Sequence, residues 1–233
     1  MADFNKLADV FDALRRDPSE SGFMELERLT EEYYLTEVYF KEGRDLHSIM
    51  LSPTFRILVD VGYVLLTRSI PDLTERSLLH EIYTDPSNFC KKVEEAYGGL
   101  SKSVGFISST FRIHAAHFLP LYKGKCRRLH GHEWKIHVGL TTESFDSRGF
   151  VTDFSDFKKM VRTITDRLDH RLLNIYFPNP TAELIQATLY LSLSARVGKS
   201  KKIVFIRVCE TENNCFEMTP AVDKPLEGVD VQV

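Results

Sequence analysis

Hydrophobic and polar residues follow two different periods along this chain of 233 residues, and the period changes near residue 100. Before that point, apolar residues recur every three or four positions, beginning with Phe4, Leu7, Val10, Phe11 and Leu14. The same spacing over residues 23–39 and 55–66 predicts further amphipathic helices, and prolines separate them. Residues 1–97 are therefore expected to form an all-helical N-terminal extension, whose role the pattern does not indicate.

A stretch rich in glycine and serine at residues 98–107 is predicted to be a linker. Beyond it, a period of two predicts strands at 108–118 and 132–143, and a short strand at 149–152 after a turn. Helices are expected from Asp153 or Ser155 to Leu168 and from Thr181 onwards, followed by strands at 203–210 and 215–218. This order predicts an α+β domain over residues 108–225, with an antiparallel sheet and helices on one face. Residues 226–233 remain as a C-terminal tail.

The composition and charge of the chain argue against nucleic-acid and membrane partners. A formal charge of -3, a pI near 6.3 and the lack of a long basic run argue against nucleic acid as a partner. The longest apolar run, at residues 57–66, contains Asp60 and is too short to cross a membrane. Four cysteines without a C-x-x-C pair, and an N-terminus without an apolar signal core, favour a reducing compartment. We therefore expect a cytoplasmic protein.

The stretch Cys126–Leu140 carries the most chemistry, because two histidines there flank a glycine at the start of a strand. The period-two register places His130 and His132 on the apolar face, about 7 Å apart along the strand. The preceding strand points His117 to the same face, whereas His114 and His137 fall on the opposite faces. Three inward imidazoles with a free fourth position suit a catalytic zinc ion.

Two interpretations, one functional and one purely structural, are open for Cys126, for the Asp169-His170 pair and for Glu210. Cys126 lies in a stretch of six residues that contains four cations, which favour its thiolate form; the alternative is an inert cysteine in a solubilising loop. Two of those cations, Lys125 and Arg127, could bind a phosphate group. The Asp169-His170 pair could move protons or simply end a helix. Glu210 follows an apolar strand, where it could form a pocket floor or lie exposed.

Six motifs in one order resemble the family of 6-pyruvoyl-tetrahydropterin and 6-carboxy-tetrahydropterin synthases, over roughly residues 108–220. The motifs are Ala115-Ala116-His117, Cys126 with three residues before His130-Gly131-His132, Gly149–Phe154, Leu168–Asn174, Asn179–Glu183 and Val208–Thr211. The resemblance implies the tunnelling fold, a four-stranded antiparallel sheet with two helices on one face. It also implies a homo-oligomer, a hexamer in the family, with active sites between subunits.

The resemblance also implies roles for the candidate residues. Zinc would be bound by His117, His130 and His132, and protons would be moved by Cys126 and His170, with Asp169 beside them. Glu210 would hold the pterin ring, and Thr181, Lys125 and Arg127 would contribute to substrate binding.

The implied reaction converts 7,8-dihydroneopterin triphosphate to 6-carboxy-tetrahydropterin, with release of acetaldehyde and triphosphate, in 7-deazaguanine (queuosine-type) biosynthesis. The three-residue gap after Cys126 is typical of the 6-carboxy type. Two alternatives remain: the 6-pyruvoyl reaction on the same substrate, and a non-catalytic pterin-binding or scaffold protein whose function lies in the helical extension.

Overall fold

The computed structural model describes residues 4–39, 52–85, 88–89, 92, 106–142, 146 and 150–218. Its helices are α1 (Phe4–Arg16), α2 (Glu20–Tyr33), the π-helix η1 (Tyr34–Tyr39), α4 (Pro53–Thr67), α5 (Leu73–Thr84), the 3-10 turn η2 (Lys125–Arg127), α7 (Phe154–Leu168), the 3-10 turn η3 (Leu173–Ile175) and α8 (Ala182–Ser194). Its strands are β1 (Phe106–His117), β2 (His130–Thr142), β3 (Lys201–Cys209) and β4 (Cys215–Met218). Most of the predicted linker and the whole predicted tail lie outside the described residues.

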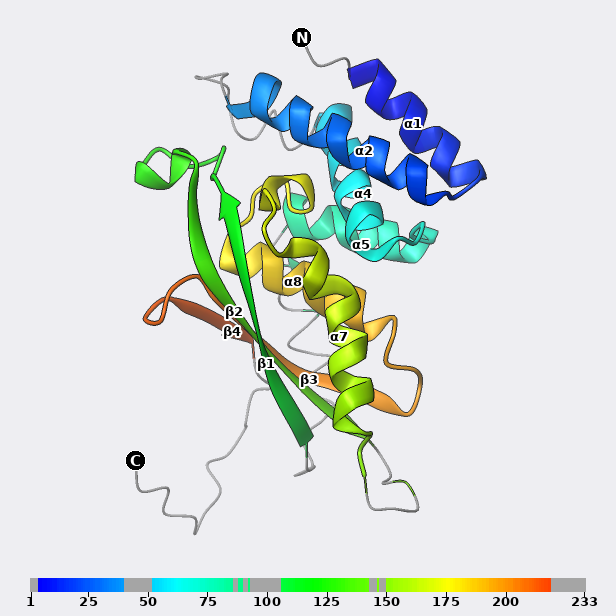
Figure 1. Cartoon of the computed structure of the whole chain (residues 1–233), viewed down its shortest axis with the longest axis vertical. Coiled ribbons are helices and arrows are strands. Elements are labelled where there is room, and N and C mark those ends of the chain that lie inside the picture. Colours follow the sequence, from blue (N-terminus) through cyan, green and yellow to red (C-terminus); the bar gives the residue numbers. More distant parts are fainter. Residues whose placement is uncertain are drawn as a thin grey trace.

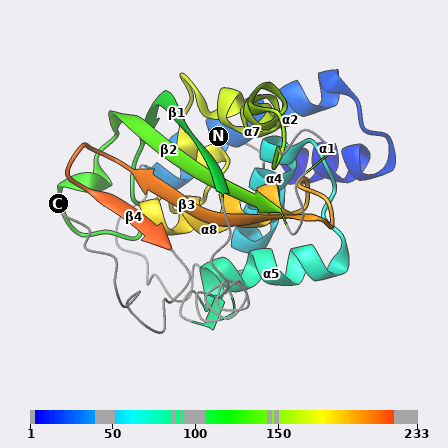
Figure 2. The same cartoon turned by 90° about the horizontal axis from the view of Figure 1, so that it is seen from below.

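The four strands form one antiparallel sheet in the order β1-β2-β3-β4. Helix α7 packs on β1, and α8 packs on β3 and β4 (Figures 1 and 2). Alternate residues of β1 are buried from Phe111 to His117, as expected for a sheet with one covered face. The predicted fold class is confirmed. The predicted short strand at 149–152 is wrong, because residues 151 and 152 form a bend and residue 150 has no regular secondary structure.

Capping residues set the starts of most helices. Asp153 accepts a hydrogen bond from the Ser155 amide at the start of α7, and Thr181 accepts one from Leu184 at the start of α8, as predicted. Ser52 caps α4, and Pro53 takes the first helical position, where its missing N–H has no cost. No helix among the described residues is long and apolar enough to span a membrane.

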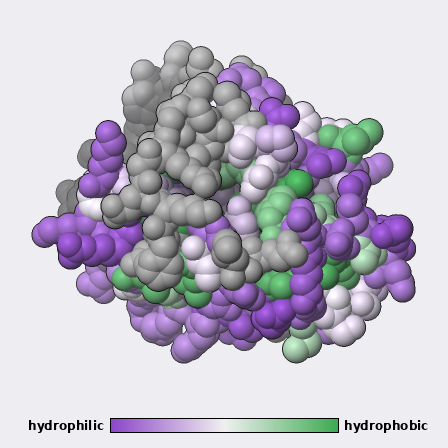
Figure 3. All heavy atoms as spheres, turned by 90° about the horizontal axis from the view of Figure 1, so that it is seen from above, coloured by the Kyte–Doolittle hydropathy of each residue, from purple (hydrophilic) through white to green (hydrophobic). Residues whose placement is uncertain are grey.

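The N-terminal helices gather at the end of the sheet where β1 finishes (Figure 1). Their apolar residues join the same continuous core as the sheet, and the buried members include Leu7, Leu26, Val64, Trp134 and Leu173. Figure 3, which looks at the molecule from above, shows several small apolar areas between polar side chains. The predicted helical extension is therefore present and is packed against the sheet domain.

Polar contacts reinforce this packing. The Arg167 and Arg196 guanidinium groups donate to the carbonyls of Leu66 and Thr67 at the end of α4, over 2.7 and 2.8 Å. Cations at a helix C-terminus also interact favourably with the helix dipole. At Gly62, the N-terminal helix α4 approaches the backbone of the sheet domain closely, since a Cβ there would lie 2.3 Å from the Tyr176 carbonyl oxygen.

A chain that begins at Gly99 is expected to aggregate. If the helices were a separate accessory bundle, such a chain would stay soluble. In the structure they cover apolar residues, among them Leu173, Ile175 and Phe177, and exposed patches of this kind promote association. Size-exclusion chromatography of the truncated chain tests this, and a monodisperse peak would contradict it.

Candidate active site

Four possible metal ligands converge where β1, β2 and β3 meet. His117 ends β1 and lies opposite His130, the first residue of β2, and Glu210 directly follows β3. The His117 Nε2 lies 3.1 Å from the His130 Nε2 and 3.0 Å from a Glu210 carboxylate oxygen. With His132, all four ligand atoms lie within 4.8 Å of one another. Ligands of a tetrahedral zinc ion are roughly 3.3 Å apart, given bonds of about 2.0–2.1 Å.

Backbone carbonyls select the tautomers of two of these histidines. The Nδ1 atoms of His117 and His130 lie 3.0 and 2.6 Å from the carbonyl oxygens of Pro180 and Arg128. Each Nδ1 therefore donates its proton to a carbonyl, which leaves Nε2 as a lone-pair donor toward the cluster. These lone pairs and the Glu210 oxygen would repel one another unless a cation lay between them.

The surroundings of His132 also indicate a cation in this cluster. Its buried Nε2 makes no hydrogen bond, although it lies 3.3 Å from Glu210. Burial lowers the pKa of His132 and so favours the neutral ring that binds metals. The cluster therefore fits a metal ion, and Glu210 is a possible ligand that the sequence did not indicate.

Asp169 and His170 lie at the edge of β1. One Asp169 oxygen accepts the backbone N–H of His114 at 2.7 Å, and the other lies 3.0 Å from the His170 Nδ1. Adjacent side chains seldom reach each other, but His170 has a left-handed backbone with φ of 57°. The pair therefore makes the contact expected of a carboxylate that orients a proton-transfer imidazole. The His170 side chain itself is exposed.

A pocket of about 650 Å³ connects the two groups. His132 lines it from the metal-ligand cluster and His170 from the proton-transfer pair, together with Arg171 and Leu129. Two of its lining residues, Glu31 and Leu35, come from the N-terminal helices. The volume is that of a typical small-molecule site.

None of the other predicted residues lines this pocket. Cys126 is a free, half-buried cysteine in the loop between β1 and β2, and its carbonyl accepts the Leu119 N–H. Lys125 is exposed, and the Arg127 guanidinium donates to the Pro120 carbonyl. The Thr181 hydroxyl accepts the Leu184 N–H as a helix cap. Their predicted roles toward a substrate stay predictions.

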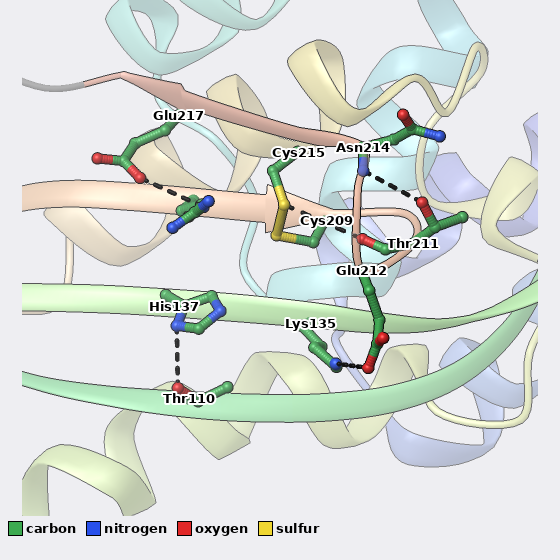
Figure 4. The surroundings of a disulfide bond; sticks show 10 residues. Thr110, Lys135, His137, Cys209, Thr211, Glu212, Asn214, Cys215 and Glu217 are labelled. Atoms are coloured by element: carbon green, nitrogen blue, oxygen red, sulfur yellow. Dashed lines mark hydrogen bonds and ion pairs between the residues drawn. A yellow bond between two sulfur atoms is a disulfide. The ribbon is translucent and has the colours of Figure 1, made fainter. Parts of the chain in front are cut away.

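The remaining two described cysteines are paired, which the sequence did not indicate. Cys209 and Cys215 form a disulfide across the turn between β3 and β4 (Figure 4). In the sequence, Glu210 directly follows the first of these cysteines. Antiparallel pairing sets the two residues directly opposite each other. The only signal in the sequence was their separation of six residues around a turn.

The stability contributed by Asp169 should depend on pH. Partial burial alone would raise the pKa of Asp169. The hydrogen bonds from His114 and His170 outweigh this effect and lower the pKa below its ordinary value of about 3.9. The contribution is therefore complete above pH 4 and is lost as pH falls through the lowered pKa. Asp169→Asn should destabilise the protein at pH 7, by an amount that shrinks at pH 3. Urea unfolding at both pH values measures this, and an equal difference at both would contradict it.

Comparisons with known proteins agree with the geometry. The family model for 6-pyruvoyl tetrahydropterin synthase matches residues 106–221. A putative 6-carboxy-5,6,7,8-tetrahydropterin synthase of Archaeoglobus fulgidus is 34% identical over 112 residues, which are 48% of this chain and 91% of the relative. The 6-carboxy-5,6,7,8-tetrahydropterin synthase of Synechocystis is 36% identical over 118 residues, covering 47% and 92%.

The chain is also similar to a relative with another named activity and to a solved structure. The dihydroneopterin monophosphate aldolase of Pyrococcus furiosus is 36% identical over 102 residues, covering 44% of this chain and 84% of the relative. The structure of Caenorhabditis elegans 6-pyruvoyl tetrahydropterin synthase aligns with a TM-score of 0.45 and 22% identity, over 52% of this chain and 99% of that one. The matched part of this chain is thus its second half.

Proposed function

Because the chain belongs to the 6-pyruvoyl tetrahydropterin synthase family, we propose that it is a zinc-dependent carbon-carbon lyase of the 6-carboxy-tetrahydropterin synthase type. Its substrate would be 7,8-dihydroneopterin triphosphate, and its products 6-carboxy-tetrahydropterin, acetaldehyde and triphosphate. Several of the similar relatives carry the 6-carboxy name, which favours this product over the 6-pyruvoyl one. The corresponding pathway would be 7-deazaguanine biosynthesis.

The observation that carries the proposal is the convergence of His117, His130 and His132 beside a pocket. Zinc suits this donor set, since imidazole is a preferred zinc ligand and two of the rings have their Nδ1 protons committed to carbonyls. A bound zinc ion would polarise substrate oxygens and acidify the neighbouring carbon or hydroxyl.

The chain's own residues would hold the substrate and move protons. His170, oriented by Asp169 and exposed to the pocket, would exchange protons with the substrate side chain. Cys126, on the loop that leads to His130, would act as the second proton-transfer group. The Glu210 carboxylate would accept the paired N–H donors of the pterin ring, for which two parallel hydrogen bonds are a good match. Lys125 and Arg127 would bind the triphosphate.

One relative favours a second candidate reaction. The Pyrococcus furiosus protein is named an aldolase of dihydroneopterin monophosphate, and it matches this chain at an identity similar to that of the 6-carboxy relatives. The same metal site and proton-transfer pair could serve an aldol cleavage, which also breaks a carbon-carbon bond. The two activities differ in the phosphorylation of the substrate and in the product.

The test is incubation of the purified, zinc-loaded protein with dihydroneopterin triphosphate and, separately, with the monophosphate. Mass spectrometry should identify 6-carboxy-tetrahydropterin from the triphosphate. A 6-pyruvoyl product, or turnover of the monophosphate alone, would assign one of the other reactions. Binding of the pterin with no product from either substrate would favour a non-catalytic binding protein.

We also infer a homo-oligomer with active sites between subunits, as the family resemblance implies. A hexamer has six times the chain mass of 26.8 kDa, which light scattering after size-exclusion chromatography resolves from a monomer.

A further inference from the structure

Residues 169–177 hold the proton-transfer pair and are fixed on one side by β1. The His170 N–H donates to the His114 carbonyl at 2.6 Å, and the Ala116 N–H donates to the Arg171 carbonyl at 3.0 Å. These bonds extend the sheet edge by a short bridge between Ala116 and Leu172. They hold the backbone of His170 but leave the Arg171 side chain and the following turn to other partners.

On the other side, the N-terminal helix α2 holds the same segment through Glu27. One Glu27 carboxylate oxygen lies 3.4 Å from the Arg171 guanidinium and accepts the Tyr176 hydroxyl at 3.3 Å. The other lies 3.4 Å from the guanidinium of Arg68. Burial, and then the charge of Glu27, raise the pKa of Tyr176, so its hydroxyl keeps the proton that it donates.

This network is more enclosed than an ordinary surface ion pair. The side chain of Glu27 is 12% exposed and that of Arg68 is 18% exposed, whereas Arg171 is half exposed. Ion pairs shielded from water are screened less by salt, and a carboxylate with several partners is held in one place. Gly62 adds a rigid contact, because α4 lies against the Tyr176 backbone with no room for a side chain.

One face of α2 and η1 runs from this network to the pocket. Glu27, Glu31 and Leu35 are four residues apart, the spacing that places side chains on one side of a helix. The latter two line the pocket beside His132 and His170. Leu35 lies in the π-helix η1, and π-helical turns occur often at functional sites.

We propose that Glu27 is a positioning residue of the active site, which holds Arg171 and thereby keeps His170 in its left-handed backbone conformation facing the pocket. Through Glu27, the N-terminal helices then contribute to catalysis. The expected effect of Glu27 on catalysis rests on the proposed function. Glu27 lies outside residues 106–221, the part of the chain that the family model matches.

The test compares Glu27→Gln with Glu25→Gln in the zinc-loaded full chain. Both changes remove one charge from α2, but Glu25 pairs with Lys6 and Arg28 on the exposed face. Glu27→Asp, which keeps the charge, provides a second variant should the glutamine variant fail to fold. The readouts are hydrogen exchange of the His170 amide, resolved by mass spectrometry, kcat and KM for the pterin substrate, and bound zinc.

We expect Glu27→Gln to speed exchange of the His170 amide about tenfold, because a lost charge-assisted contact favours local opening. The kcat should fall roughly tenfold to a hundredfold with little change in KM, since misplacement of a catalytic group affects the chemical step. Zinc content should stay that of the parent. Glu25→Gln should change none of these, and Glu27→Asp should recover part of the loss.

Unchanged exchange at His170 and unchanged kcat in Glu27→Gln would overturn the inference. So would faster exchange spread evenly over the helices, which would show that Glu27 only stabilises the fold. If the parent turned over no pterin, the proposed function would fail by itself. The exchange at His170 would still decide whether Glu27 holds that residue.

Discussion

His132→Ala is expected to reduce bound zinc from about one ion per chain to nearly none. The parent offers three imidazoles and a carboxylate within 4.8 Å, and removal of His132 leaves two histidines and the more adaptable Glu210. Because Glu210 is proposed to hold the pterin ring and not the ion, the two remaining imidazoles are too few to hold a catalytic zinc ion tightly. Metal analysis of dialysed protein by plasma mass spectrometry measures the loss, and turnover should vanish with it.

His137→Ala is the matched control for this prediction. It lies on the same strand, but its side chain is on the opposite face of the sheet, where the ring bonds the Thr110 hydroxyl at 2.9 Å (Figure 4). Zinc content should be unchanged in this variant. Full zinc occupancy in a His130→Ala, His132→Ala double variant would exclude the proposed site.

Cys126→Ala is expected to lower turnover by roughly 10² to 10⁴, the usual contribution of a general acid-base group. The substitution leaves the zinc ligands and Glu210 intact, so the variant should still bind zinc and pterin. In the parent, iodoacetamide should modify Cys126 and inactivate the enzyme, while Cys209 and Cys215 are protected in their disulfide. Steady-state kinetics and peptide mapping provide the measurements.

Cys90→Ala is the comparison variant, since it removes a thiol outside the family motifs, and its kcat should equal that of the parent. If Cys126→Ala turned over substrate at the parent's rate, Cys126 would have no part in proton transfer. His170 would then be the only candidate left for that step among the residues named above.

Periodicity predicted most of the sheet, because one face is buried and the other is not. A shift of one residue would turn every side chain of a strand to the wrong face, so the alternation from Trp134 to Leu140 fixes the register. The same rule correctly separated His130 and His132 from His137. Helix starts were predictable where a capping residue marks them, as at Asp153 and Thr181.

Contacts between distant parts of the chain could not be predicted in this way. The position of Glu210 among the histidines depends on the alignment of β3 with β2, which includes a register shift near Gly139. The Glu27 and Arg171 side chains are charged residues that a single sequence places on solvated faces. Their contact follows from the packing of α2 on the turn after α7, and no local pattern encodes it.

The closeness of Gly62 to Tyr176 has a consequence for how the chain folds during synthesis. Helices α1 to α5 leave the ribosome first, but their apolar faces meet partners such as Phe177 only about 90 residues later. At about 5–20 residues per second, this interval lasts roughly 5–20 s. The Tyr176 hydroxyl bond to Glu27 spans 149 residues, and contacts of such long range are slow to form. The amphipathic helices must therefore remain soluble as a nascent segment until the second half of the chain is made.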